Sequence, residues 1–319
     1  MALELKGKID MSTFTTFFPS AIKTYHKQAY DRLSPSKTTF AAEGKTVFIT
    51  AGATGIGYAI CESFAAAGVA QIVIIQRREE VLAKAKQALE SKYPKTKITT
   101  YAASANDRKR MTEVLQEVGH IDVLVPCAAA GNADVPAYEV TADDLENVFV
   151  TNVVAPFHLI TEFLKLPCTG RRSVIYVSSA ASQLAAGNQV AYGPSKAAAN
   201  QIILHLALAC AGKDVFFHTF HPGVIPTELS QNAVGKDAFD WEDRKQNPVR
   251  DIASHMCDTW VLTFDVAKVP GDWAVWLASP EADWLSGRFT WAEWDVDELL
   301  TLKERAEKDP MFLTTSVYV

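Results

Sequence analysis

Thr46-Val47-Phe48-Ile49-Thr50-Ala51-Gly52-Ala53-Thr54-Gly55-Ile56-Gly57 is a short apolar run that ends in a glycine-rich turn, and a helical pattern continues from it to about residue 67. An apolar run of this length beside glycines is typical of a buried strand. Glycine-rich turns often only connect two elements, but this one stands between a strand and a helix. There the backbone can approach a pyrophosphate closely and the helix N-terminus offers free N–H groups. The stretch therefore predicts a dinucleotide site formed by Gly52, Thr54, Gly55, Ile56 and Gly57.

The same alternation of apolar runs and helical patterns continues toward the C-terminus. Strands are expected at 72–75, 97–102, 121–125, 173–178, 214–220 and 288–291, and helices at 79–93, 107–118, 141–166, 189–212 and 273–278. Short apolar strands separated by longer helices are typical of a parallel sheet covered on both faces. The fold class predicted is α/β, a doubly wound parallel sheet of the Rossmann type.

The regular alternation covers residues 44–292, which we interpret as one domain. An N-terminal arm of residues 1–43 precedes it, and a C-terminal tail of residues 293–319 follows it. Residues 228–262 interrupt the alternation with a polar stretch. We expect this excursion to cover the substrate site.

Composition excludes several classes of function. The net charge of −6 leaves no broad basic surface, so no nucleic-acid partner is expected. The five scattered cysteines show no zinc spacing and no disulfide framework, which predicts reduced thiols and no metal. We see no signal peptide, and the longest apolar helical stretch, at 202–211, is too short for a bilayer; a cytoplasmic protein without a membrane partner is expected.

Gln76-Arg77-Arg78 stands at the end of the second strand, where a protein selective for NAD carries an acidic residue that binds the ribose. A guanidinium can instead pair with a 2′-phosphate in bidentate geometry. A solvated pair of cations is the alternative, but arginines at the start of a helix oppose its dipole. Arg77 and Arg78 therefore favour NADP over NAD.

Tyr192 and Lys196 lie four residues apart, which places them on one face of a helix. A free tyrosine, with a pKa near ~10, is a weak acid/base at neutral pH. A neighbouring ammonium favours the phenolate. The pair Tyr-x-x-x-Lys is common by chance, and its weight here comes from Ser179, which ends the preceding strand and can bind the substrate oxygen beside Tyr192.

With these residues in place, the chain resembles the short-chain dehydrogenase/reductase family over residues 44–292. The resemblance implies that Ser179 polarises the substrate and that Tyr192 is the general acid/base. It implies that Lys196 binds the nicotinamide ribose and tunes Tyr192, and that Asn152 supports a proton-relay water.

The resemblance extends to further cofactor contacts and also shows departures. His221-Pro222-Gly223-Val224-Ile225-Pro226-Thr227 resembles the segment that contacts the nicotinamide carboxamide, which implicates Ile225 and Thr227. Ser104 stands where an aspartate commonly meets the adenine. Ala51 replaces the first glycine of the family's turn, where a methyl group could crowd a left-handed backbone position or the phosphate. Ala128-Ala129-Ala130-Gly131 stands where the family has Asn-Asn-Ala-Gly, which removes side-chain amides that brace the sheet and line the adenosine pocket. The resemblance implies that Ala128 contacts the cofactor there.

The arm and the ending Gly287-Arg288-Phe289…Trp294-Asp295-Val296-Asp297-Glu298-Leu299 resemble a subgroup known mainly from filamentous fungi, many of whose members act in specialised metabolism. The function expected is an NADP(H)-dependent carbonyl reductase or alcohol dehydrogenase acting on a small carbonyl or alcohol. A non-redox enzyme on the same fold, a cyclase or dehydratase, is the alternative, and a catalytically silent binding protein is a third. The resemblance also implies a homodimer or homotetramer formed through the helices at 141–166 and 189–212.

Two other groups of residues have structural explanations. His218 and His221 flank a predicted strand and are expected to make local hydrogen bonds rather than bind a metal. For the tryptophans near the C-terminus, core or interface packing explains their number at least as well as an aromatic substrate wall. They are Trp273, Trp276, Trp284, Trp291 and Trp294.

Overall fold

Parallel strands form the centre of the molecule. The computed structural model describes residues 22–133, 135–167, 169–183, 188–225, 227–230 and 264–314. In this part of the chain the sheet has seven strands in the order β3-β2-β1-β4-β5-β6-β7. All six pairings are parallel. The strands are β1 (Thr46–Thr50), β2 (Gln71–Gln76), β3 (Lys97–Ala102), β4 (Val123–Val125), β5 (Arg172–Val177), β6 (Val215–His221) and β7 (Phe289–Trp291).

Both faces of this sheet are buried because successive side chains of a strand point to opposite faces. Along β1, Val47 and Ile49 pack in one core, whereas Phe48 packs in the other. Along β5, Ile175 and Tyr176 divide in the same way. Continuous apolar strands are therefore explained by two cores, one on each face, as the sequence predicted.

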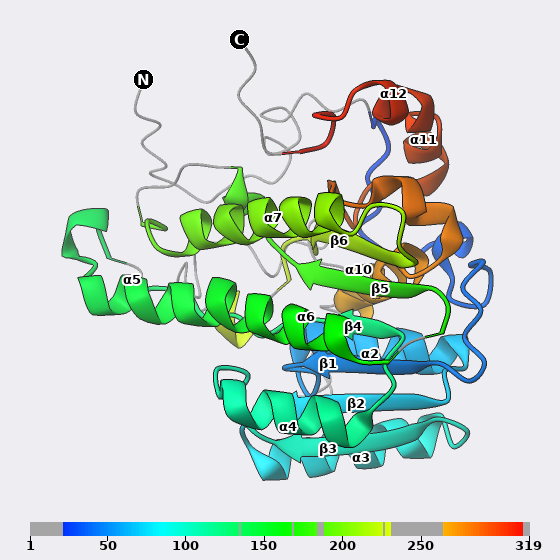
Figure 1. The fold of residues 1–319 in the computed structure, drawn as a ribbon, viewed down its shortest axis with the longest axis horizontal. Helices are drawn as coiled ribbons and strands as arrows, with labels where there is room; N and C mark the ends of the chain where they lie inside the picture. Colours follow the sequence, from blue (N-terminus) through cyan, green and yellow to red (C-terminus); the bar gives the residue numbers. More distant parts are fainter. Residues whose placement is uncertain are drawn as a thin grey trace, which may run out of the picture.

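Helices cover each face. They are α2 (Gly55–Ala67), α3 (Glu79–Lys92), α4 (Arg108–Val118), α5 (Ala142–Phe149), α6 (Ala155–Lys165), α7 (Tyr192–Ala209) and α10 (Phe264–Leu277). Figure 1 shows α4, α6 and α7 in front of the sheet and α2 and α10 behind it. The doubly wound α/β fold predicted from the sequence is confirmed.

The chain reverses its direction of progress across the sheet between β1 and β4. From β1 it moves outward through β2 to β3, and from β4 it moves the other way toward β7. In folds of this kind a ligand binds at the carboxyl ends of the strands, at the point of this reversal. The loops that follow β1 and β4 meet there.

The helical segment 142–165 contains an interruption. The π-helical segment η3 (Val150–Val154) joins α5 to α6, and Asn152 lies in it. The sequence predicted one uninterrupted helix there. By length and composition alone, these 24 residues could also cross a membrane, unlike the shorter stretch singled out in the sequence. Val148, Leu159 and Phe163 are buried against the rest of the fold, so we interpret the segment as a core helix.

Helix α10 begins nine residues earlier than the segment 273–278 predicted for it. Pro270 and Gly271 hid this start, because both residues are unfavourable inside helices. Their positions have a packing reason: a Cβ on Gly271 would lie 2.6 Å from the carbonyl oxygen of Ala59 in α2. The glycine lets the two helices approach closely. The predicted helix 189–212 also has different ends, since α7 runs from Tyr192 to Ala209.

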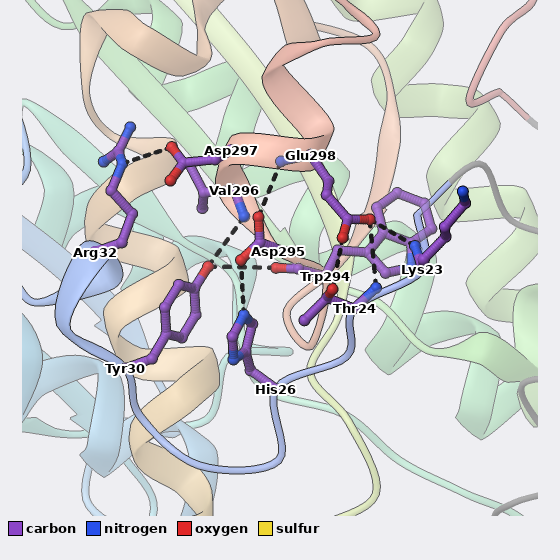
Figure 2. Close-up of polar contacts among 10 residues, drawn as sticks. All are labelled: Lys23, Thr24, His26, Tyr30, Arg32, Trp294, Asp295, Val296, Asp297 and Glu298. Carbon is purple, nitrogen blue, oxygen red and sulfur yellow. Dashed lines mark hydrogen bonds and ion pairs between the residues drawn. The ribbon is translucent and has the colours of Figure 1, made fainter.

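Residues 22–33 of the arm lie along residues 293–298, as Figure 2 shows. The Glu298 carboxylate accepts hydrogen bonds from the Thr24 hydroxyl at 2.5 Å and from the Lys23 backbone N–H at 2.6 Å. His26 Nε2 lies 2.8 Å from Asp295 Oδ2. Tyr30 Oη accepts the backbone N–H of Val296 at 3.0 Å. The two predicted extensions of the domain are therefore joined to each other by side-chain contacts.

Arg288 fixes the end of the described chain. Its guanidinium donates to the carbonyl oxygen of Ala306, at the end of α12 (Lys303–Lys308), at 2.5 Å, and to that of Phe312. Cations near the C-terminus of a helix can bind its free carbonyls. The helices α11 (Val296–Leu300) and α12 were not predicted from the sequence. Most of the predicted excursion 228–262, along with residues 1–21 and 315–319, lies outside the described residues.

Candidate active site

The turn after β1 requires glycine at several positions. Ala51 has a φ of +53° and Gly55 a φ of +52°, the left-handed region that side chains disfavour. A Cβ on Gly57 would lie 2.3 Å from the Ala51 carbonyl oxygen, and one on Gly52 would lie 3.0 Å from Cys61 Sγ. The alanine that replaces a glycine of the family pattern is therefore held in the strained conformation that its position predicted.

The loop after β4 is braced by side chains of other elements. Thr50 Oγ1 accepts the backbone N–H groups of Cys127 at 2.9 Å and Ala128 at 3.0 Å. The Asn152 amide pairs with both backbone groups of Ala130, accepting its N–H and donating to its carbonyl, each at 2.8 Å. The sequence comparison suggested that the alanine run removes bracing amides. Thr50 and Asn152 supply that bracing from outside the loop.

The second predicted cofactor segment lies over the glycine turn. Ile225 packs against Ala59 and Ile56 of α2. The Thr227 methyl group comes within 3.1 Å of a Cβ built on Gly55. The α2 N-terminus has no side-chain cap, since Thr54 makes no capping hydrogen bond, so its N–H groups remain available to an anion.

The predicted adenosine end of the site lies at the ends of β2 and β3. Arg77 and Arg78 follow β2 with exposed side chains. Arg78 lies 3.8 Å from the Glu228 carboxylate, which reaches it from the segment containing Thr227. Ser104 is partly buried in the loop after β3, where its hydroxyl accepts the N–H of Asn106 at 3.2 Å.

Tyr192 is the first residue of α7, and its side chain interacts with that of Ser179, which follows β5. Burial raises the pKa of Tyr192 to about 12, although the interaction with Ser179 acts in the opposite direction. The Ser179 hydroxyl also accepts the N–H of Ala181 at 3.2 Å, which fixes its position. The structure thus brings together the serine and tyrosine that the sequence singled out.

Lys196 lies one turn after Tyr192 and is only 1% exposed. Its Nζ is 5.7 Å from the centre of the Tyr192 ring and donates to Val177 O at 2.8 Å and Tyr176 Oη at 3.1 Å. Burial lowers the pKa of Lys196 to about 8, while the nearby Cys127 thiol acts to raise it. A lysine with this pKa changes its protonation state a little above neutral pH.

Asn152 is fully buried between the cofactor loop and α7. Besides pairing with Ala130, its amide donates to Ser195 Oγ at 2.9 Å. Ser195 in turn donates to Tyr192 O at 2.7 Å. π-Helical turns often occur at functional sites, and η3 places the fourth predicted catalytic residue behind Tyr192.

Sequence reasoning missed two residues of the site. The Asn132 amide oxygen accepts the backbone N–H of Tyr192 at 3.3 Å and so helps to define the start of α7. Tyr176 contacts Lys196 directly. An asparagine after a Gly is a weak signal for a helix cap, and nothing in the pattern of β5 distinguishes Tyr176 from any other core aromatic residue.

The histidines and tryptophans have structural roles. The Ala180 N–H donates to His221 Nδ1 at 3.1 Å, as expected for a local hydrogen bond. His218 corrects the same expectation: its imidazole is buried and finds no hydrogen-bond partner among the described residues. Trp273 and Trp276 are fully buried and Trp291 nearly so. For these three, core packing is the correct interpretation.

Comparison with known proteins agrees with this geometry. The short chain dehydrogenase family profile matches residues 45–238. A short chain dehydrogenase/reductase named AacuD from Aspergillus aculeatus is 41% identical, over 97% of this chain and all of that protein. A short chain dehydrogenase/reductase from Claviceps purpurea is 40% identical, over 95% of this chain and 97% of its own.

Solved structures share the fold. One described as a Pseudomonas aeruginosa RhlG/NADP active-site complex has a TM-score of 0.63 and 24% identity, over 79% of this chain and 96% of its own. The fungal sources of the relatives agree with the subgroup that the sequence indicated. From the profile match, the identities and the fold together, the chain belongs to the short-chain dehydrogenase/reductase family of oxidoreductases.

Proposed function

We propose that this protein is an NADP(H)-dependent oxidoreductase that interconverts a carbonyl and an alcohol, with Tyr192 as general acid/base. One observation carries the proposal: the Tyr192 hydroxyl contacts Ser179 and lies beside the Lys196 ammonium, at the strand ends where the glycine turn lies. A carbonyl oxygen bound between Ser179 and Tyr192 would meet two hydroxyl groups.

The residues around the crevice fit a nicotinamide dinucleotide. The turn at Gly52 and Gly57 has no room for side chains, so backbone can approach the pyrophosphate, and the uncapped start of α2 favours its charge. Ile225 and Thr227 would cover the nicotinamide side. When bound, the cofactor supplies or accepts the hydride.

Arg77 and Arg78 support the preference for NADP. Both are exposed where a 2′-phosphate would lie, and a guanidinium pairs with phosphate in bidentate geometry. In this proposal Ser104 would contact the adenine, and Ala128 would line the same pocket. The NADP complex among proteins of this fold is consistent with this assignment.

The protonation states favour carbonyl reduction. With its pKa raised to about 12, Tyr192 keeps its proton at neutral pH and can donate it to the oxygen that becomes the alcohol. The Lys196 ammonium stabilises the resulting phenolate. Ser179 orients the carbonyl. Relatives in filamentous fungi support an intermediate of specialised metabolism as the substrate.

A second candidate is a cyclase or dehydratase that uses the pocket without net redox change. The left-handed Ala51 is the observation that favours it, since a methyl group there stands beside the pyrophosphate position. Such an enzyme would convert substrate with no change of absorbance at the nicotinamide band.

The proposal is tested first by fluorescence titration of NADPH and NADH at one ionic strength. We expect tighter NADPH binding, followed by NADPH oxidation with a carbonyl substrate found by screening. Tyr192→Phe should retain NADPH binding and lose at least about 100-fold in turnover, the size of general acid catalysis. Tyr93→Phe, a change at the end of α3, is the matched control. Unchanged turnover in Tyr192→Phe would refute the mechanism.

We also propose a homodimer or homotetramer in the cytoplasm, with only a small-molecule partner at the site. Val154 and Phe157 on the segment 142–165, and Leu208 on α7, are more than 40% exposed. Apolar side chains of this size are enriched where subunits meet. The expected result of light scattering is an oligomer for the natural chain and a smaller species for Phe157→Glu. The described Cys61, Cys127 and Cys210 are free thiols, which suits a reducing compartment.

A further inference from the structure

A short chain of hydrogen bonds runs behind the proposed catalytic pair. Lys196 Nζ donates to Tyr176 Oη at 3.1 Å, and Tyr176 Oη donates to the backbone carbonyl of Asn152 at 2.9 Å. Tyr176 is fully buried on β5, Lys196 lies on α7 and Asn152 lies in η3. Three separate elements are therefore joined at one tyrosine hydroxyl.

The direction of each bond in this chain is fixed by chemistry. A lysine ammonium can only donate and a backbone carbonyl can only accept. The single hydroxyl proton of Tyr176 must therefore point at Asn152, and its lone pairs must face Lys196. Burial raises the pKa of Tyr176 well above its ordinary value, so the hydroxyl keeps that proton.

The contacts also determine which ammonium proton remains for the site. Of its three N–H groups, one donates to Tyr176 and one to Val177 O. The ammonium lies 4.6 Å from the Tyr176 ring centre and 5.7 Å from that of Tyr192. With two donors held by β5, one N–H remains for Tyr192 or a bound cofactor.

We infer that Tyr176 is a positioning residue that anchors the Lys196 ammonium to the backbone of Asn152; this rests on the function proposed above. The sequence resemblance gave Asn152 a supporting role through a bound water. In this chain the asparagine amide is occupied by Ala130 and Ser195, and the carbonyl oxygen already accepts the tyrosine hydroxyl. The Tyr176 hydroxyl therefore links the Asn152 carbonyl oxygen to the Lys196 ammonium.

The anchor should be visible in the titration of Lys196. The titratable groups that face its ammonium are Tyr176 from β5, Tyr192 from α7 and Cys127 from the loop after β4. Of these, Tyr176 is the one that accepts a hydrogen bond from it. Tyr176→Phe removes an acceptor that favours the charged lysine, so the pKa of Lys196 should fall from its value of about 8.

The experiment follows the ¹³Cε resonance of Lys196 against pH in ¹³C-lysine-labelled protein, assigned by its loss in Lys196→Arg. Tyr176→Phe should lower the midpoint by about one pH unit, since hydrogen bonds to charged groups are of that size. Tyr30→Phe removes a partly buried hydroxyl that accepts the N–H of Val296, and it is the matched control. Its Lys196 midpoint should equal that of the natural protein. Equal midpoints in all three proteins would overturn the inference.

A second readout separates positioning from plain packing. With NADPH and the carbonyl found by screening, the kcat of Tyr176→Phe should be about tenfold lower than that of the natural protein. The pKa of Lys196 read from the pH dependence of kcat should fall by as many pH units as the NMR midpoint. A purely structural role would lower thermal stability and leave both midpoints in place. If the natural protein oxidises no NADPH, the proposed function fails, whereas the NMR titration of the cofactor-free protein still decides the role of Tyr176.

The natural protein offers a check that needs no folded variant. A tyrosine hydroxyl proton held by a buried carbonyl exchanges slowly with water and gives its own NMR resonance. Such a resonance, with contacts to Lys196 protons, is expected. A Tyr176 hydroxyl that exchanges as fast as an exposed one would contradict the anchor.

Discussion

The Asn152 amide and the Ser195 hydroxyl are hydrogen-bonded at 2.9 Å, and this bond fastens the π-helical segment to the first turn of α7. The same amide holds both backbone groups of Ala130. One buried side chain thus connects the cofactor loop with the helix that carries Tyr192 and Lys196.

Asn152→Ala should therefore cost stability. The change leaves the N–H and carbonyl of the partly buried Ala130 without their side-chain partner, and unsatisfied groups of this kind cost about 1–3 kcal/mol each. We expect the free energy of unfolding, measured with urea, to fall by about 2–4 kcal/mol. Asn147→Ala, at an exposed position of α5, should change it by less than about 0.5 kcal/mol. Equal effects of the two variants would show that the bonds of Asn152 contribute little.

Lys196 should make stability depend on alkaline pH. Its pKa is about 8 in the folded chain against an ordinary 10.5, so the folded state loses this proton first as pH rises. Between pH 8 and 10.5 the unfolded state binds more protons than the folded state. The free energy of unfolding therefore rises as the pH is raised through this window, and the gain is lost as the pH falls back through 8. Below pH 8 the folded state holds a buried charge at its full cost.

Lys196→Met removes this titration. The stability of the natural protein relative to Lys196→Met should rise by about 2 kcal/mol between pH 7 and pH 10. Urea unfolding of both proteins at the two pH values measures it, and other titrating groups cancel in the difference. A constant difference would mean that the pKa of Lys196 is the same folded and unfolded.

His218 and His221 are both buried, and both should make the free energy of unfolding depend on acidic pH. Burial lowers the pKa of each to about 3 from an ordinary 6.5, so stability is lost as pH falls below 6.5, where the unfolded chain takes up protons. His218→Leu and His221→Leu should each reduce the loss between pH 7 and pH 4.5 by about 2 kcal/mol.

At pH 7 the two variants should differ. His218 has no hydrogen-bond partner in the described part of the chain, so His218→Leu should be neutral or stabilising. His221→Leu leaves the Ala180 N–H without its acceptor and should cost about 1–3 kcal/mol. It should also reduce turnover, because Ala180 follows Ser179. Identical urea midpoints at pH 7 would contradict this reading of the hydrogen bond.

Parts of this site could be predicted from the sequence because each depends on residues close together in the chain. A five-residue apolar strand followed by glycines fixes the turn after β1, and a spacing of four places Tyr192 and Lys196 on one helix face. The strand order then brings Ser179 to Tyr192. These steps use only periodicity, turn chemistry and the rules for parallel sheets.

The features of the fold and site that the sequence did not predict depend on packing between segments that are distant in the chain. The extra residue of η3 is set by the fit of Asn152 between Ala130 and Ser195, which no helical pattern records. In the sequence, Tyr176 cannot be distinguished from a core aromatic residue. Only the structure shows that its hydroxyl, on β5, contacts Lys196 on α7. The early start of α10 was hidden because Pro270 and Gly271 are read as helix breakers, whereas contact with α2 accommodates them.

The pairing of Arg78 with Glu228 gives a prediction about cofactor selectivity. Their side chains lie 3.8 Å apart and are 55% and 81% exposed. A 2′-phosphate that binds Arg78 would have to compete with this carboxylate and would be repelled by it. Removing the charge should therefore favour NADPH, which carries the phosphate, and leave NADH unaffected.

Glu228→Gln should lower the NADPH dissociation constant by about two- to fivefold at low ionic strength, the size of an exposed ion pair. The gain should shrink in high salt, because screening weakens interactions between exposed charges. Fluorescence titration with both nucleotides measures it, and Glu90→Gln, which breaks a comparable exposed pair with Lys86 at the far end of α3, is the control. An equal gain in affinity for NADH would show that Glu228 affects the binding of both nucleotides and does not act on the 2′-phosphate. No gain in NADPH affinity at low salt would show that Arg78 does not bind the 2′-phosphate.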